Sequence, residues 1–164
     1  ITNSYATGSV TSTGSQVGGL AGMVQTSSTI TNSYATGAVT GISQVGGLVG
    51  LAYGSITHSY ATGRVTGTGD YTGGLVGRAD RSSTISNSYA TGEVTGSDYT
   101  GGLVGFAGKS SRVTNSYWDT ETTGQTKSAG GTGKTNEEMK TADTYSAWDT
   151  DVWNIVNGEY PTLR

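Results

Sequence analysis

The chain repeats one pattern of apolar and polar residues at a spacing of 26 to 29 residues, marked by Tyr5, Tyr34, Tyr60, Tyr89 and Tyr117. Each repeat opens with an aliphatic residue between two polar ones, as in residues 29–31, which is the alternation typical of a strand with one buried face. An Ala-Thr-Gly turn, a valine and a Gly-Gly-Leu phrase follow. A fixed period in this range indicates stacked structural units. Each repeat therefore predicts three short strands separated by glycine bends.

Three short strands in about 27 residues describe one coil of a β-solenoid. The sequence thus predicts an all-β fold, a right-handed parallel β-solenoid (β-helix) of about four coils over residues 1–117. Helical repeats would not tolerate this density of glycine and β-branched residues. Propeller blades need roughly 40 residues or more. A single coil buries too few aliphatic side chains to offset its ordering entropy, so the coils must stack.

The repeat stops near Trp118, and residues 118–164 form a predicted C-terminal capping segment. Residues 119–134 are polar and rich in glycine, which predicts a long loop. Thr135 and Glu138 fit a capping box, so one short helix over about 136–141 is expected, with Met139 as its buried residue. All three tryptophans lie in the last third of the chain. We expect this apolar bulk to cover the open solenoid end, whose unpaired strand edges favour aggregation.

The composition narrows the possible partners. The chain has 164 residues, 28 glycines, no cysteine and a net charge of −3. Because the net charge is negative, the chain is not expected to bind nucleic acid. Because it has no cysteine, neither a disulfide framework nor a thiolate metal site can form. No apolar run is long enough to cross a bilayer, so no membrane span is expected. The chain begins on Ile1 inside a repeat and shows no signal peptide, so we expect a mature segment or part of a longer protein, with self-association through its uncapped N-terminal end as one possible contact.

The repeat also resembles a known family. The phrase Asn-Ser-Tyr-Ala-Thr-Gly-x-Val-Thr-Gly followed by Gly-Gly-Leu-Val-Gly is similar to the GLUG repeat of large secreted bacterial and archaeal proteins. That family includes haemagglutinin-like adhesins and some IgA-directed peptidases, in which the repeats lie outside the catalytic domain. The departures are His58 in place of asparagine, and Thr72 and Thr100 in place of valine. The resemblance implies an extracellular, cell-surface β-helical protein but no particular ligand.

Few residues offer catalytic chemistry. His58 is the only histidine and occupies an asparagine position of the repeat, which favours a tolerated substitution over a nucleophile–base pair or a zinc site. Asp70 and Asp98 lie one coil apart and could act together in glycoside hydrolysis or bind Ca²⁺, although solvated turn residues are the simpler interpretation. We therefore assign no catalytic, cofactor-binding or metal-binding residue, and expect a non-enzyme. A carbohydrate-active β-helix enzyme is one alternative.

Threonine columns suggest a second alternative. Columns of outward threonines on a flat, weakly charged solenoid can order water, which resembles the ice-binding faces of β-solenoidal antifreeze proteins. Exposed strand positions also favour threonine for structural reasons alone. The candidate ice-binding face comprises Thr2, Thr29, Thr31, Thr57, Thr84, Thr114, Thr7, Thr36, Thr62, Thr91, Thr11, Thr40, Thr66 and Thr95.

Aromatic residues provide candidate glycan contacts. The tyrosine of the main repeat points into the coil if the strand alternates strictly, whereas a bend after Asn32 would place Ser33 inside and Tyr34 outside. Tyr71 and Tyr99 replace Gln16 and Gln44 of earlier coils and could stack on sugar rings. The first hypothesis is therefore a non-enzymatic extracellular structural or adhesive segment of a cell-surface protein, contacting glycan, host protein or neighbouring copies.

Overall fold

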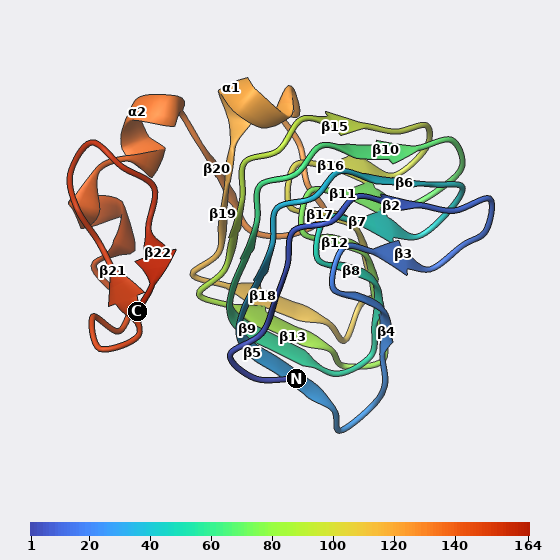
Figure 1. Cartoon of the computed structure of the whole chain (residues 1–164), viewed down its shortest axis with the longest axis horizontal. Helices are drawn as coiled ribbons and strands as arrows, with labels where there is room; N and C mark the ends of the chain where they lie inside the picture. Colours follow the sequence, from blue (N-terminus) through green and yellow to red (C-terminus); the bar gives the residue numbers. More distant parts are fainter.

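The computed structural model describes all 164 residues and contains a parallel β-solenoid with a C-terminal segment on its flank (Figure 1). Each of the first four coils runs through the same succession of short strands. The first two coils contain β1 (Tyr5–Ala6), β2 (Val10–Thr11), β3 (Val17–Gly18), β4 (Ala21–Val24), β5 (Thr29–Ala35), β6 (Val39–Gly41), β7 (Val45–Gly46) and β8 (Val49–Ala52). The next two contain β9 (Ser55–Ala61), β10 (Val65–Gly67), β11 (Thr72–Gly73), β12 (Val76–Ala79), β13 (Thr84–Ser86), β14 (Tyr89–Ala90), β15 (Val94–Thr95), β16 (Thr100–Gly101) and β17 (Val104–Ala107).

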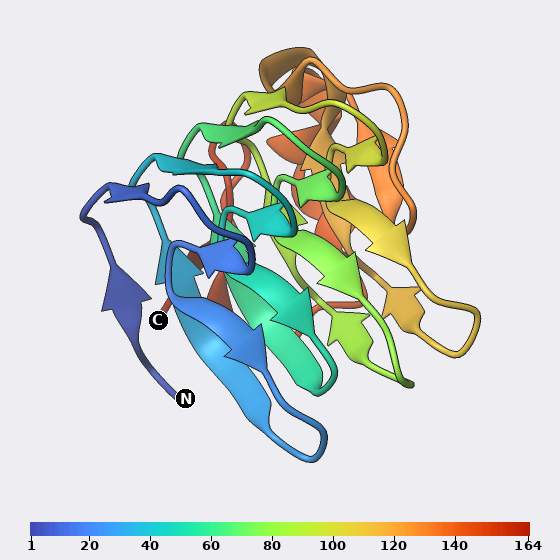
Figure 2. The same ribbon diagram turned by 90° about the vertical axis from the view of Figure 1, so that its right-hand side faces the viewer.

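Equivalent strands pair in parallel from coil to coil and form four sheets, visible as stacked arrows in Figure 2. The register aligns identical residues, so that Ile30, Ile56 and Ile85 follow one another in a column. This arrangement confirms the predicted parallel β-solenoid of about four coils. Each coil has strands at four positions instead of the expected three, because the chain bends within the Gly-Gly-Leu phrase; in the fourth coil the first position is divided between β13 and β14. At that bend a Cβ on Gly73 would collide with the Val76 carbonyl oxygen.

The core consists of the periodic aliphatic residues. Ile56, Leu75 and Val76 are fully buried, and their equivalents in the neighbouring coils lie in the same cluster. Each such side chain stabilises the fold by about 2 kcal/mol on burial. The pattern that predicted the strands therefore also predicts the core.

A backbone bend in each coil decides which way the tyrosine points. The asparagine positions of the repeat take the left-handed conformation, with φ of 49° at Asn32 and 48° at His58. Asparagine adopts this region more readily than most residues, which explains its recurrence in the repeat. The bend turns Ser33 inward, where it is fully buried, and Tyr34 outward from the coil.

The inward serines form a hydrogen-bonded ladder along the solenoid. The Ser59 hydroxyl donates to the Thr57 carbonyl oxygen at 2.9 Å and accepts from the Ser33 backbone N–H at 3.4 Å. Ser88 accepts in turn from the Ser59 N–H at 3.1 Å. The ladder satisfies amides that the bend removes from the regular pairing of the sheet.

Residues 112–134 complete the stack and cover its C-terminal end. They contain β18 (Arg112–Thr114), β19 (Tyr117–Asp119), α1 (Thr120–Thr123) and β20 (Thr132–Lys134). The segment expected to be a loop therefore holds a helix and a strand, and β20 extends the first sheet by pairing with β19. The Gly102 N–H donates to the Lys127 carbonyl oxygen at 2.9 Å, so this segment lies across the edge of the fourth coil.

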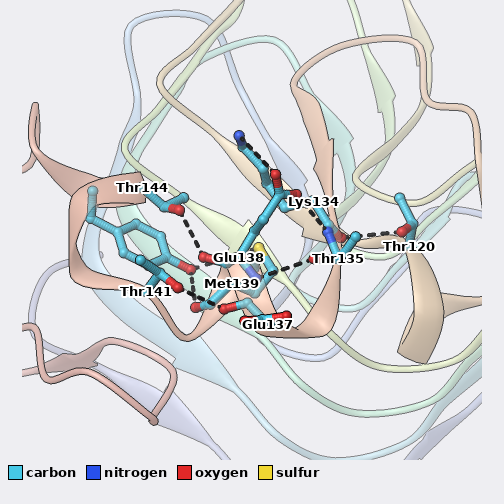
Figure 3. Close-up of polar contacts among 9 residues, drawn as sticks. Thr120, Lys134, Thr135, Glu137, Glu138, Met139, Thr141 and Thr144 are labelled. Carbon is cyan, nitrogen blue, oxygen red and sulfur yellow. Dashed lines mark hydrogen bonds and ion pairs between the residues drawn. The ribbon is translucent and has the colours of Figure 1, made fainter.

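Residues 135–164 lie along the flank instead of over the open end. They contain α2 (Asn136–Met139), the 3₁₀ helix η1 (Ala142–Tyr145), β21 (Trp153–Asn154) and β22 (Thr162–Leu163). The predicted capping box is present: the Thr135 hydroxyl accepts from the Glu138 N–H at 3.2 Å and the Glu138 carboxylate accepts from the Thr135 N–H at 2.9 Å (Figure 3). Met139 is buried as predicted, and the helix ends there.

The C-terminus comes close to the first coils (Figures 1 and 2). The structure contains no helix with the length and apolar character needed to cross a membrane.

Candidate binding surfaces

The outward tyrosines form a continuous stack along the solenoid axis. The ring centroids of Tyr5 and Tyr34 are 5.2 Å apart, those of Tyr34 and Tyr60 are 4.8 Å apart, and those of Tyr60 and Tyr89 are 5.0 Å apart. The interplanar angles in this stack do not exceed 8°. The tyrosine column therefore faces outward from the coils, which agrees with the interpretation that places a bend after Asn32.

The C-terminal segment covers only part of this stack. Trp148 and Trp153 pack on it, with the Trp153 ring centroid 6.0 Å from that of Tyr89. The exposed fraction consequently falls from 66% at Tyr5 to 9% at Tyr60 and 1% at Tyr89. Burial raises the pKa of Tyr60 to about 12, with a further contribution from Tyr34, and raises the pKa of Tyr89 well above its usual value. The buried tyrosines are therefore structural.

Asp119 anchors the C-terminal segment to the solenoid. Its carboxylate is completely buried and accepts from the Tyr160 hydroxyl at 2.6 Å and the Asn136 side-chain amide at 2.8 Å. The other carboxylate oxygen caps α1 by accepting from two backbone amides. Burial alone would raise the pKa of Asp119, but the four hydrogen bonds outweigh it and lower the pKa. The group joins three parts of the chain and holds them in place.

A cleft of about 410 Å³ opens where the C-terminal segment leaves the stack uncovered. One wall comes from the first two coils and the other from the chain around β21 and β22. The lining residues are Asn3, Ser4, Tyr5, Asn32, Tyr34, Asp151, Val152, Leu163 and Arg164. The cleft thus combines aromatic rings, side-chain amides and one charged side chain of each sign.

A second aromatic surface surrounds the candidate glycan contacts Tyr71 and Tyr99. Their ring centroids are 5.1 Å apart, and Phe106 lies edge-on to both at 5.3 and 5.8 Å. Arg78 lies over the Tyr71 and Phe106 rings and pairs with Asp80 at 2.7 Å. The hydrogen bond from Arg78, with one from the Arg81 amide, lowers the pKa of Asp80. We call Tyr71, Arg78, Tyr99 and Phe106 the aromatic surface.

The structure places the candidate threonines in columns on different parts of the solenoid. Thr11, Thr40, Thr66 and Thr95 align in the second sheet, and Thr2, Thr31, Thr57 and Thr114 align with Ser86 in the first. Thr29 and Thr84 align beside this column with Ser55 and Arg112. The column of Thr7, Thr36, Thr62 and Thr91 lies between the two sheets. None of these threonines is buried. In the first sheet the Thr84 hydroxyl donates to the Ser55 hydroxyl at 2.8 Å, so part of the hydroxyl capacity is used between coils.

The remaining candidates lie apart from one another. Asp70 and Asp98 are neighbours across one coil and both are exposed, with the Tyr71 N–H donating to the Asp98 carbonyl oxygen at 3.1 Å. His58 contacts the Thr57 hydroxyl and the Asn87 amide, each at 3.2 Å. Arg64 and Glu93, which are exposed on adjacent coils, form an ion pair at 2.8 Å. No three His, Cys, Asp or Glu side chains come together as a metal site would require.

Two features of these surfaces were missed from sequence. Arg78 and Phe106 occupy equivalent positions of successive repeats, as the pairing Arg78↔Phe106 shows, so aligning the Gly-Gly-Leu phrases could have placed them beside Tyr71 and Tyr99. No periodic signal relates Asp151 or Arg164 to the first coils, because they lie outside the repeat.

Comparison with known proteins identifies the repeat. Residues 13–40, 41–66 and 68–95 match "The GLUG motif", which agrees with the resemblance seen in the sequence. No curated protein shows a significant sequence match. A solved crystal structure described as a "putative immunoglobulin A1 protease from Bacteroides ovatus" superposes with a TM-score of 0.73 at 27% sequence identity. The match covers all of this chain and 57% of that chain.

Proposed function

The chain belongs to the GLUG-motif family, and from this membership and its surfaces we propose that it is a non-catalytic, extracellular structural segment that adheres to glycan. Parallel coils in register form a rigid rod that can hold a contact surface at a fixed position. Because the chain spans 57% of the similar solved structure, any activity of that protein need not lie in the matching part. Contacts with host protein, or between copies through the edge of the first coil, are the other forms that adhesion could take.

The aromatic surface is the observation that carries the glycan proposal. This corner of the coil requires a left-handed backbone conformation, which Gln16 and Gln44 take in the earlier coils. Tyr71 and Tyr99 take it with φ of 67° and 53°, although bulky residues rarely adopt it. Tyr99 is 58% exposed, so burial offsets little of that strain. Strained, exposed residues are concentrated at functional sites. Arg78 is neutralised by Asp80, so the surface suits the apolar faces of neutral sugar rings.

Binding to immobilised neutral polysaccharides tests this proposal. Tyr99→Asn removes the ring, and asparagine adopts the left-handed conformation readily, so the coil should be retained. We expect the variant to bind about 10-fold more weakly, which corresponds to about 1.4 kcal/mol of lost ring contact. Val156→Ala removes an exposed apolar side chain of the C-terminal segment and should bind like the parent chain. Equal binding by the parent chain and Tyr99→Asn, or no binding to any polysaccharide, would exclude glycan contact through this surface.

The non-catalytic part of the proposal has its own assay. The similar solved structure carries the description of a protease, so immunoglobulin A1 is the substrate to offer. We expect it to stay intact after prolonged incubation with this chain. Cleavage by the parent chain would contradict a non-catalytic role, and its loss in an Asp70→Ala, Asp98→Ala double variant would assign it to these carboxylates.

Ice binding is the second candidate, and the register of the first sheet favours it. Thr29 and Thr31 project on either side of the inward Ile30, and residues 55–57 and 84–86 repeat this arrangement in the next coils. An ice-binding chain would show thermal hysteresis that is lost in Thr31→Tyr. A parent chain without thermal hysteresis removes this candidate.

A further inference from the structure

The cleft at the uncovered end of the tyrosine stack has the properties of a small-ligand site. Its volume of about 410 Å³ lies within the range of ligand pockets, about 300–1,000 Å³. It lies between two separate parts of the chain, the first two coils and the residues around β21 and β22. The aromatic surface shares none of its residues with this cleft. We propose that the cleft binds a single neutral pyranose residue, as a second site independent of the aromatic surface.

The tyrosines provide the apolar part of such a site. Tyr5 is stacked against Tyr34 with an interplanar angle of 8°, and no other aromatic ring packs on it. With 66% of the residue exposed, Tyr5 has ring surface free for a ligand. The C–H groups on one face of a pyranose pack well against a tyrosine ring, whose other end remains polar.

The polar residues of the cleft provide hydrogen-bonding groups that the protein leaves unused. The Asn3 side-chain amide makes no hydrogen bond within the chain, and Asp151 forms no ion pair. Arg164 donates from Nε to the Thr150 carbonyl oxygen at 2.8 Å, which fixes its stem and leaves the two terminal nitrogens free. A carboxylate accepts from sugar hydroxyls, whereas guanidinium and amide groups donate to them. The set therefore matches a ligand rich in hydroxyl groups.

The charged side chains of the cleft select against an anionic ligand. Asp151 and Arg164 both line the cleft but do not form an ion pair with each other. An anion would be attracted by Arg164 and repelled by Asp151, and a cation would meet the opposite pair of forces. A neutral polyhydroxylated ring can hydrogen-bond to both groups without either penalty. The carboxylate of Asp151 therefore disfavours a uronic acid relative to a neutral sugar.

The walls of the cleft are held in place before any ligand binds. The Arg164 N–H donates to the Val152 carbonyl oxygen at 3.0 Å, and β21 pairs with β22. Trp153, the first residue of β21, is fully buried against the tyrosine stack. Because Trp153 pairs with Leu163, the cleft residues Asp151, Val152 and Arg164 lie at one end of this strand pair. They line the cleft from fixed backbone positions, which reduces the ordering cost of binding.

An amide-resolved NMR titration of the 164-residue chain tests the proposal. The probes are the methyl glycosides of glucose, galactose, mannose and N-acetylglucosamine, with glucuronic acid as the charged comparison. We expect at least one neutral glycoside to give saturable shifts at Asn3, Tyr5, Asp151 and Arg164, with a Kd of about 1 mM. Glucuronic acid should bind at least about 5-fold more weakly than that glycoside.

Two variants of cleft residues test whether the shifts arise from binding in the cleft. Asp151→Asn keeps the shape of the side chain and should weaken binding about 10-fold, and Tyr5→Ala should do the same; both positions are exposed, so folding should be retained. Tyr99→Asn, which alters only the aromatic surface, should leave the titration unchanged. A failure of the cleft proposal is therefore distinguishable from a failure of the proposed glycan contact at the aromatic surface. The absence of saturable shifts with every neutral glycoside at about 50 mM overturns the proposal, as do unchanged affinities in both cleft variants or tighter binding of glucuronic acid.

Discussion

At the scale of the residue, several positions of the repeat follow from the demands of the backbone and not from side-chain chemistry. Asn32 and its equivalents allow the left-handed bend that points Ser33 inward and Tyr34 outward. The serine then satisfies amides that the bend has removed from the sheet. His58 makes the same bend with φ of 48°, which supports its interpretation as a tolerated substitution. The motif is thus recognisable because each of these residues enables a specific turn of the coil.

Gly73 gives the prediction at this scale. A Cβ at this position would collide with the Val76 carbonyl oxygen and the Gly105 amide nitrogen, both of which are backbone atoms in the interior of the stack. Gly73→Ala should therefore lower the free energy of unfolding by about 3 kcal/mol or more, since neither atom can move without shifting a strand. Urea denaturation followed by circular dichroism measures the change.

Gly8→Ala is the matched control for this variant. A Cβ on Gly8 would meet no atom within 4 Å, and the position does not have positive φ. Its stability should equal that of the parent chain or exceed it by up to about 1 kcal/mol, because alanine reduces the entropy of the unfolded chain. Equal stability of Gly73→Ala and Gly8→Ala would contradict the close packing described for the Gly-Gly-Leu bend.

At the scale of the element, one buried carboxylate makes several of the hydrogen bonds that attach the C-terminal segment to the solenoid. Asp119 lies at the end of β19, caps α1 and accepts hydrogen bonds from Asn136 in the first turn of α2 and from Tyr160 near the C-terminus. Trp148 adds a second attachment by donating from its indole nitrogen to the Asn115 carbonyl oxygen at 2.8 Å. These contacts place α2 and the following chain against the tyrosine stack.

The prediction at this scale concerns Asp119→Asn. Asparagine can still cap α1, but its amide nitrogen would face the Asn136 amide, a donor, in place of the carboxylate. We expect a loss of about 2 to 3 kcal/mol in unfolding free energy at neutral pH, because a hydrogen bond to a buried charge is lost. Urea denaturation at several pH values measures it, with the exposed Asp70→Asn as a control that should change stability by less than about 0.5 kcal/mol.

The pH dependence of this difference follows from the lowered pKa of Asp119. The stabilisation is fully present above the unfolded-state pKa of about 3.9 and is lost as the pH falls through the lower pKa of the folded state. The difference in unfolding free energy between the parent chain and Asp119→Asn should therefore become smaller below about pH 4. If this difference in unfolding free energy stays constant until the chain unfolds in acid, the carboxylate charge does not contribute to the attachment.

At the scale of the whole molecule, periodicity explains what could be predicted and what could not. Ile56, Leu75 and Val65 recur in phase, so their burial followed from the sequence, and α2 followed from the local capping box. The position of residues 135–164 did not follow, because Trp148 and Trp153 have no periodic partner that indicates which face of the solenoid they cover. Tyr71 and Tyr99 were found by comparing coils, whereas the cleft depends on a contact between the first coils and the C-terminus. The sequence therefore could not predict where a segment outside the repeat docks on the solenoid.

The docking of this segment makes the whole molecule sensitive to alkaline pH. Burial raises the pKa of Tyr60 to about 12 and raises those of Tyr89, Tyr145 and Tyr160 above the usual value, with neighbouring tyrosines adding to the shift at Tyr89. For groups whose folded pKa is raised, the stabilisation is complete below the unfolded-state pKa of about 10 and is lost as the pH rises through the folded pKa.

We expect the C-terminal segment to detach between about pH 10 and 12. Tyrosinate absorbance should then show a late phase that coincides with a change in tryptophan fluorescence, because Trp148 and Trp153 lose their contact with the stack. In Asp119→Asn this late phase should begin at lower pH, since the attachment is already weakened. A single tyrosinate phase near pH 10, with unchanged tryptophan fluorescence, would contradict the burial of the tyrosine stack beneath the C-terminal segment.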